Sequence, residues 1–281
     1  MQPSRPAREA TEGWRAELSL RFEPRGEQTR LVRHAHRGPL RVQRPFHPEG
    51  DGTCHVYLLH PPGGVVGHDQ LHIEAAATAD TRGLVTTPGA GKLYRSHGKR
   101  ATVHQELYVQ AGAQLEWLPQ ETIAFCGAHA RLHTRIELEP GGQFFGWELL
   151  CLGRPACDES FDRGRLSQRI ELFQGGELRW LERSLIDGGS PMLRAPWGLR
   201  GRSVLGTLVC APADAAWLDV ARAVDSNGDV ELGVSFVRGL LVARVLADGA
   251  EQARAAFESL WRALRPLYAG SEAVRPRVWN T

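Results

Sequence analysis

Short segments in which apolar and polar residues alternate recur along much of this 281-residue chain. In a β-strand successive side chains point to opposite faces, so this alternation is typical of a strand with one buried face. Glycine pairs at Gly141-Gly142 and Gly175-Gly176 mark turns between such segments. Many short strands separated by turns predict a mainly β fold. The expected strands include residues 18–22, 103–109, 132–138, 166–173 and 177–183.

Two α-helices are expected, both near the C-terminus. Residues 214–224 place apolar side chains on one helical face before the turn Asn227-Gly228, and residues 249–268 repeat the pattern over a longer segment. Between them a β-hairpin is expected around Arg238-Gly239. The expected buried faces are Ala216, Trp217, Val220, Ala221 and Val224 in the first helix, and Ala253, Phe257, Leu260, Trp261 and Leu264 in the second.

The ends of the longer helix carry recognisable signals. Asp248 is the expected N-cap, with Glu251 three residues later as its capping-box partner. Pro266 is expected to mark the end, because proline disrupts the interior of a helix.

No linker interrupts the chain, so residues 1–281 are expected to form a single domain. Residues 1–12, which are rich in proline, arginine and alanine, are expected to be a flexible lead-in.

Composition excludes several classes of protein. The net charge of +2, with both signs interspersed, argues against nucleic-acid binding. The chain has no apolar run that would span a bilayer, and its first residues lack the apolar core of a signal peptide. The five cysteines are an odd number at irregular spacings. These features predict a cytoplasmic protein with reduced thiols and no membrane or nucleic-acid partner.

All eleven histidines lie between His34 and His133. The asymmetry fits a half of the chain that handles metal, but histidines scattered over solvated strands give the same distribution. We favour the second interpretation, because scattered histidines usually satisfy local hydrogen bonds or face solvent.

A glycine-rich segment with a lysine, Gly89-Ala90-Gly91-Lys92, imitates a phosphate-binding loop. Thr86 stands where that loop needs its first glycine, and Leu93 stands where it needs a hydroxyl to hold Mg²⁺. We interpret the segment as a structural turn.

His68 and His72 imitate the zinc-hydrolase pattern of two histidines four residues apart. That pattern requires a helix, whereas the flanking residues favour a turn and a strand. On a strand the two rings would lie about 13 Å apart, too far for one ion.

Three carboxylates, Asp69, Glu121 and Glu148, lie among apolar, proline or glycine residues. A buried carboxylate needs a cation, a hydrogen-bond donor or water. Each is either a functional group or half of an ordinary buried ion pair, with Lys92, Arg95 and Arg154 as candidate partners. For Glu148 the two-residue period of a strand predicts a face shared with Gly146 and Leu150.

Several longer motifs resemble those of a known family, the UreD (UreH) urease accessory proteins. The resemblance extends from about Leu31 to the C-terminus. The motifs are GPLRVQRPF (38–46), CHVYLLHPPGGVVG (54–67), TPGAGKLYRS (87–96), WLPQETI (117–123), LGRPA (152–156) and RVWNT (277–281).

The resemblance implies a helically wound β architecture flanked by two helices. It also implies a urease maturation factor that is not an enzyme and works with UreF, UreG and the urease apoprotein. No permanently bound cofactor is expected, only transient nickel. Sparse carboxylates would hold nickel weakly enough to release it, so Asp69, Glu121 and Glu148 are hypothetical positions on a nickel path.

Two alternatives remain open. One is a metal-dependent hydrolase that uses His68 and His72 without partners. The other is an assembly scaffold through which no nickel passes.

Overall fold

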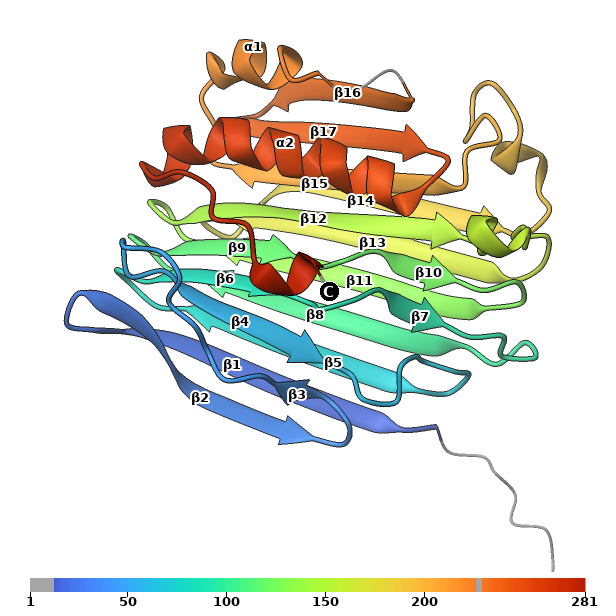
Figure 1. The fold of residues 1–281 in the computed structure, drawn as a ribbon, viewed down its shortest axis with the longest axis horizontal. Coiled ribbons are helices and arrows are strands. Elements are labelled where there is room, and N and C mark those ends of the chain that lie inside the picture. The colour runs from blue at the N-terminus through green and yellow to red at the C-terminus, as the bar shows by residue number, and fades with distance from the viewer. Residues whose placement is uncertain (1–12, 226–228, 281) are drawn as a thin grey trace, which may run out of the picture.

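Two facing β-sheets make up most of the protein in the computed structural model, which describes residues 13–225 and 229–280 (Figure 1). The seven-stranded sheet has the order β14-β13-β11-β8-β5-β1-β2. Its strands are β1 (Arg15–Arg25), β2 (Gln28–Arg37), β5 (Gln70–Ala77), β8 (Ala101–Val109), β11 (His129–Leu138), β13 (Arg165–Gln174) and β14 (Glu177–Asp187).

The second sheet has ten strands, of which eight follow the order β16-β17-β15-β12-β9-β6-β4-β3, while β10 and β7 extend from β12. Its strands are β3 (Arg41–Val42), β4 (Cys54–Leu59), β6 (Arg82–Thr86), β7 (Gly91–Leu93), β9 (Gln114–Leu118), β10 (Thr122–Ala124), β12 (Gln143–Leu152), β15 (Val204–Ala211), β16 (Val230–Val237) and β17 (Leu240–Ala247).

Between β4 and β13 the chain alternates between the sheets. Strands β5, β8, β11 and β13 are parallel neighbours in one sheet, and β4, β6, β9 and β12 are parallel neighbours in the other. The backbone therefore winds as a coil, and the predicted mainly β, helically wound architecture with two late helices is confirmed.

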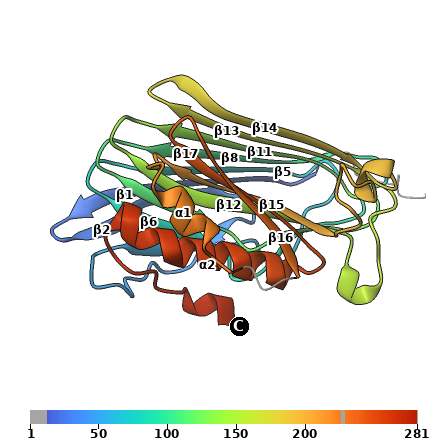
Figure 2. The ribbon, with the colours of Figure 1, turned by 90° about the horizontal axis from the view of Figure 1, so that it is seen from above.

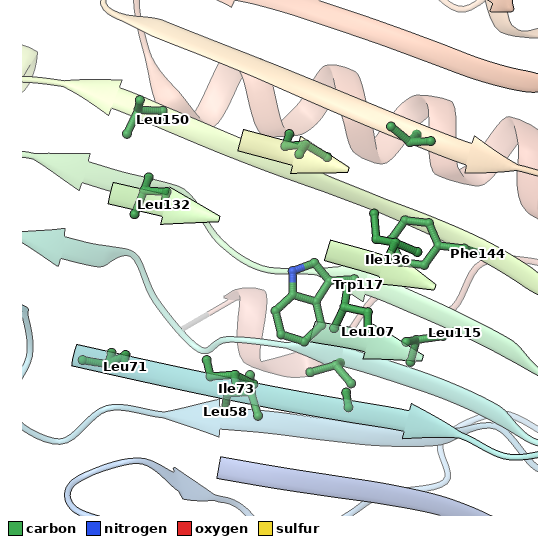
Figure 3. Packing of buried hydrophobic residues seen from close by; sticks show 14 of the residues in the cluster. Leu58, Leu71, Ile73, Leu107, Leu115, Trp117, Leu132, Ile136, Phe144 and Leu150 are labelled. Atoms are coloured by element: carbon green, nitrogen blue, oxygen red, sulfur yellow. The ribbon is translucent and has the colours of Figure 1, made fainter. Parts of the chain in front are cut away.

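The alternating residues fill the space between the sheets. On β1 Leu18, Leu20 and Phe22 are buried, and on β11 Ile136 and Leu138 are buried, while the residues between them are more exposed. Figure 3 shows side chains from both sheets meeting in this layer, among them Leu107, Ile136, Trp117 and Phe144. Burial of one face explains why the two-residue period marks these strands so clearly.

Helix α2 (Ala250–Ala269) covers the outer face of the ten-stranded sheet, on the side away from the seven-stranded one (Figure 2). The predicted face is confirmed, since all five of its apolar residues are buried in a second cluster beneath the helix. These residues are Ala253, Phe257, Leu260, Trp261 and Leu264.

The predicted N-cap of α2 was wrong by one residue, and the helix continues three residues beyond the predicted stop at Pro266. The N-cap is Gly249, whose N–H donates to Gln252 Oε1 at 3.1 Å. Asp248 pairs with Arg202 instead of capping the helix. Pro266 lies inside the final turn and the helix ends at Gly270 (φ 70°). Proline removes one backbone hydrogen bond, a loss that the buried face of the helix offsets.

Helix α1 (Trp217–Arg222) is shorter than predicted, and Val220 on its expected buried face is 39% exposed. The turn predicted at Asn227-Gly228 lies outside the described residues, as does the lead-in predicted at residues 1–12. The hairpin of β16 and β17 is confirmed. Arg238 and Gly239 both have positive φ, as a two-residue turn that matches strand twist requires.

Three short 3₁₀ segments complete the described structure: Pro155–Cys157, Pro191–Leu193 and Arg277–Asn280. Among the described residues, no helix combines the length and the apolar character needed to cross a membrane.

Candidate functional site

Glu148 projects from β12 into the layer between the sheets. The Thr134 hydroxyl on the opposite sheet donates to Glu148 Oε1 at 3.0 Å. The inner face of β12 also carries Gly146 and Leu150, as the strand period predicted, while Trp147 packs on the outer side beneath α2.

A small cavity of about 10 Å³ borders the Glu148 side chain, close to the space that one water molecule needs. Trp117, Thr134 and Thr207 are among the residues that line it. Gly146 also lines this cavity. A Cβ there would lie 2.6 Å from the Phe144 ring and 2.9 Å from the Trp117 carbonyl oxygen. The glycine lets these neighbours approach the strand closely.

Burial raises the pKa of Glu148 to about 7, against the opposing effect of the Thr134 hydrogen bond. No salt bridge to Glu148 occurs within the part of the chain that the structure describes. A carboxyl group of this kind is readily neutral and gains its charge when a cation approaches.

Thr207 connects this cavity with the outside. It lies opposite Glu148 in the β12–β15 pairing and lines both the small cavity and an open hollow of about 620 Å³. Its hydroxyl donates to Glu182 Oε1 at 2.6 Å, and Arg244 holds the other oxygen of Glu182 at 2.8 Å. A line of polar groups therefore runs from the surface to Glu148.

The polar line continues on the other side of Glu148. Gln105 lies beside Thr134 in the β8–β11 pairing. Its Oε1 atom is buried and has no hydrogen-bond partner among the described residues. A buried unpaired oxygen is costly unless water or a cation reaches it.

Glu121 lies in the connection between β9 and β10, beneath α2. Its Oε2 atom is 3.6 Å from a guanidinium nitrogen of Arg254, and both side chains are largely buried. The ion-pair partner is therefore on the helix, and is none of the three cations considered from the sequence.

Asp69 has a clear local role. One of its oxygens accepts the N–H of Trp14 at 2.7 Å, and the other accepts the N–H of Val66 at 2.8 Å. The carboxylate thus fastens the turn before β5 to the start of β1. The three predicted carboxylates lie beside different partners, and the structure does not bring them into one cluster.

A second buried polar network, between β9 and α2, was not predicted from the sequence. Glu116 on β9 accepts hydrogen bonds from Trp261 at 2.7 Å, Arg265 at 3.0 Å and Tyr268 at 2.5 Å, all from α2. Arg265 also pairs with Glu49 at 2.6 Å. Burial lowers the pKa of Arg265, but Glu116 and Glu49 outweigh it and raise the pKa above its usual value.

This network fastens α2 to the ten-stranded sheet. One signal in the sequence could have pointed to it, since Glu116 interrupts the apolar run of Leu115, Trp117 and Leu118. A charge inside such a run needs a buried partner. Nothing in the pattern identifies that partner as Arg265.

His68 and His72 do not form the pair that a zinc-hydrolase pattern requires. His72 lies on β5, and His68 lies in the preceding turn with φ 73°. The prediction of a turn and a strand is confirmed. His72 lies instead beside His104 and Glu106 on the neighbouring strand β8.

The glycine-rich segment at Gly89-Ala90-Gly91-Lys92 leads from β6 into β7, which pairs with β10. No helix follows it, whereas a phosphate-binding loop opens a helix. Gly89 lies in a bend before β7 and Ala90 follows it, whereas Gly91 and Lys92 already lie in that strand, so the predicted turn covers only half of the segment.

The amino-acid sequence is similar to those of known proteins. Residues 15–280 match the model of the family described as "UreD urease accessory protein". The chain is similar to "Urease accessory protein UreD" of Dechloromonas aromatica (strain RCB), with 44% identity over 97% of this chain and 96% of the relative. It is also similar to the protein of that name from Marinobacter nauticus (strain ATCC 700491 / DSM 11845 / VT8), with 48% identity over 95% and 93% of the two chains.

Proposed function

Because the chain belongs to the UreD family of urease accessory proteins, we propose that it is a non-catalytic maturation factor that passes nickel toward the urease apoprotein. Nickel is the cargo in this role, and no resident cofactor is needed. The five cysteines are free thiols, which suits the reducing cytoplasm in which we place this function.

The observation that carries the proposal is the polar line through Thr207. It links an open hollow at Glu182 with the enclosed carboxyl group of Glu148 between the sheets. A route for an ion needs an entrance, an interior ligand and an exit. In this proposal Glu182 lies at the entrance, Glu148 is the interior ligand, and Gln105 lies on the far side toward an exit.

The chemistry of these groups suits transfer rather than storage. A site of several imidazole or thiolate ligands would retain nickel tightly, because nickel stands high in the affinity order of divalent metals. One carboxylate with hydroxyl and amide neighbours holds the ion weakly and lets it leave. Glu121 and Asp69 remain hypothetical further positions, with Asp69 the weaker because backbone N–H groups occupy both of its oxygens.

The proposed partners are UreF, UreG and the urease apoprotein, as the family resemblance implies. UreG would supply nucleotide hydrolysis, since Lys92 of this chain lies in strand β7 and not in a phosphate-binding loop before a helix. The surface of this chain would hold the assembly together while the ion passes between the sheets.

The proposal is tested with Glu148→Gln, which keeps the shape of the side chain and removes its charge. Urease, its accessory proteins and this chain are produced together in cells at limiting nickel. We expect the complex to form as in the wild type and urease activity per assembled complex to fall at least severalfold. The matched control is Glu177→Gln on β14, whose side chain is 78% exposed.

Each alternative makes a different prediction in the same cells. A pure scaffold predicts wild-type activation by Glu148→Gln, and this result would overturn the conduit. An independent hydrolase predicts turnover by the purified chain without partners, which is lost when His72 is replaced.

A further inference from the structure

Three histidines form a row across the outer face of the seven-stranded sheet. His72, His104 and His133 lie on β5, β8 and β11 and are direct partners in the parallel register. The ring centroids of His72 and His104 are 5.1 Å apart, and those of His104 and His133 are 4.6 Å apart with an interplanar angle of 6°. Parallel strands in register give this spacing, because neighbouring strands lie about 4.8 Å apart.

Glu106 lies two residues beyond His104, so its side chain projects from the same face of β8. One of its oxygens is 3.4 Å from His72 Nε2 and the other is 3.4 Å from His104 Nε2. One ligand atom from each of the three residues lies within 4.8 Å of the others. The carboxylate therefore bridges two imidazoles that lie on adjacent strands.

The two 3.4 Å distances, each to a different oxygen of Glu106, match the spacing of neighbouring ligand atoms in a tetrahedral metal centre. For metal–ligand bonds of about 2.0–2.1 Å, adjacent ligand atoms of a tetrahedron lie about 3.3–3.4 Å apart. Two imidazole nitrogens and one carboxylate oxygen are a ligand set that zinc and nickel accept. The side chains of His72, His104 and Glu106 are 45%, 32% and 23% exposed, so the cluster borders solvent, although the His104 Nε2 atom itself is enclosed.

His104 supplies a second, independent observation. Its Nε2 atom is enclosed and makes no hydrogen bond with any of the described residues. Its 3.4 Å contact with Glu106 does not have hydrogen-bond geometry, so this ring nitrogen lacks the hydrogen bond that a buried imidazole normally makes. The His104 Nε2 atom faces the Glu106 carboxylate, as His72 Nε2 does. A cation bound between them would coordinate the His104 nitrogen.

His133 is not a ligand in this site, because its own Nε2 atom already pairs with Glu171 Oε2 at 2.6 Å. It stacks against His104 and supports the orientation of that ring. Arg135, a cation on the same strand as His133, is paired with Glu137. The local charge is therefore compatible with a bound divalent ion.

We propose that His72, His104 and Glu106 form a surface site for one borderline divalent cation such as Zn²⁺ or Ni²⁺, with its fourth coordination position open to solvent. The site lies on the outer face of the sheet, whereas the line of groups around Glu148 lies on the inner face. It does not depend on the nickel route, and either can exist without the other.

The test is a titration of the purified full-length chain with Co²⁺, which reports a tetrahedral site through its intense visible absorption, followed by competition with Zn²⁺ and Ni²⁺. We expect one tetrahedral Co²⁺ per chain, displaced by Zn²⁺. His72→Gln, His104→Gln and Glu106→Gln should each lower the affinity at least about tenfold, because even the outer partners of metal ligands contribute that much.

Two further variants serve as controls. His34→Gln removes an exposed histidine on β2, and it should leave the affinity unchanged. His133→Gln should change it by no more than a few fold, since its Nε2 is committed to Glu171. Equal Tm values show that each variant is folded, and Glu106→Gln preserves side-chain shape if a histidine variant is unstable.

Two results would overturn the site. One is the absence of a tetrahedral Co²⁺ spectrum with the wild-type chain at micromolar to millimolar metal. The other is binding whose affinity is the same in the wild type, His72→Gln and His104→Gln. Neither result bears on urease activation by Glu148→Gln, so the two proposals fail separately.

Discussion

Arg265 Nε on helix α2 lies 3.0 Å from Glu116 Oε1 on strand β9, and neither side chain is exposed to solvent. A second carboxylate, Glu49, lies 2.6 Å from the same guanidinium and 2.5 Å from His55. Three distant parts of the chain are thus joined through one buried cation.

Replacing Arg265 should therefore destabilise the fold strongly. We expect Arg265→Met to lower the free energy of unfolding by about 3–5 kcal/mol, since two buried carboxylates lose their partner. Denaturant unfolding measures this. Arg262→Met, which removes an exposed i,i+4 partner of Glu258, should cost no more than about 1 kcal/mol. Equal losses of unfolding free energy in the two variants would show that the buried Arg265 pairs contribute no more than an exposed ion pair.

Glu148 should make stability depend on pH. Its folded-state pKa of about 7 exceeds the usual 4.5, so its favourable contribution is complete below pH 4.5 and is lost as the pH rises to about 7. The loss amounts to about 3 kcal/mol. Glu148→Gln should abolish this part of the pH profile and gain stability over the wild type at pH 8. Parallel profiles of wild type and variant would contradict the raised pKa.

Gly146 should tolerate no side chain. Gly146→Ala places a methyl group 2.6 Å from Phe144 and 2.9 Å from the Trp117 backbone. We expect a loss of about 1–3 kcal/mol from overpacking, measured by denaturant unfolding. Gly233→Ala on β16 is the matched control, because no heavy atom lies within 4 Å of its added Cβ. That variant should stay within about 0.5 kcal/mol of the wild type.

The edge strand β14 should limit solubility when the chain is alone. Leu185 is 56% exposed, Leu181 is 39% exposed, and Trp197 in the following connection is 75% exposed. Exposed apolar residues near an unpaired strand edge promote association.

We expect Leu185→Lys to raise the concentration at which the isolated chain aggregates by at least about twofold, as followed by light scattering. Val220→Lys on α1, which has 39% exposure, should have a smaller effect. If the isolated wild type is already monomeric at high concentration, this interpretation of the edge is wrong.

Much of the fold could be predicted because the two-residue period is imposed by burial of one face. The inner residues of β1 and β11 followed from this period. The buried face of α2 followed from the helical period, and the hairpin at Arg238-Gly239 from its turn residues. The helix ends were less predictable, since Gly249 and Asp248 compete for the N-cap and Pro266 is tolerated in the last turn.

The candidate site was predictable only in part. The strand period placed Glu148 on one face of β12 with Gly146 and Leu150, and the structure shows that this face is the inner one. Arg265 and Glu116 are 149 positions apart, and no local pattern relates them. The row of histidines required the register between strands, which depends on how the whole coil closes. The expected single domain and the roles of Asp69 and Glu121 stay predictions.

The parallel winding of the chain has a consequence for how its surface is composed. Each circuit of the coil lays its residues beside those of the circuit before, so one position recurs as a column that crosses the strands. A residue introduced on one strand therefore lies beside residues of the two adjacent strands, whose identity and spacing are fixed by the register. New surface chemistry can be assembled one strand at a time, without moving the backbone that supports it.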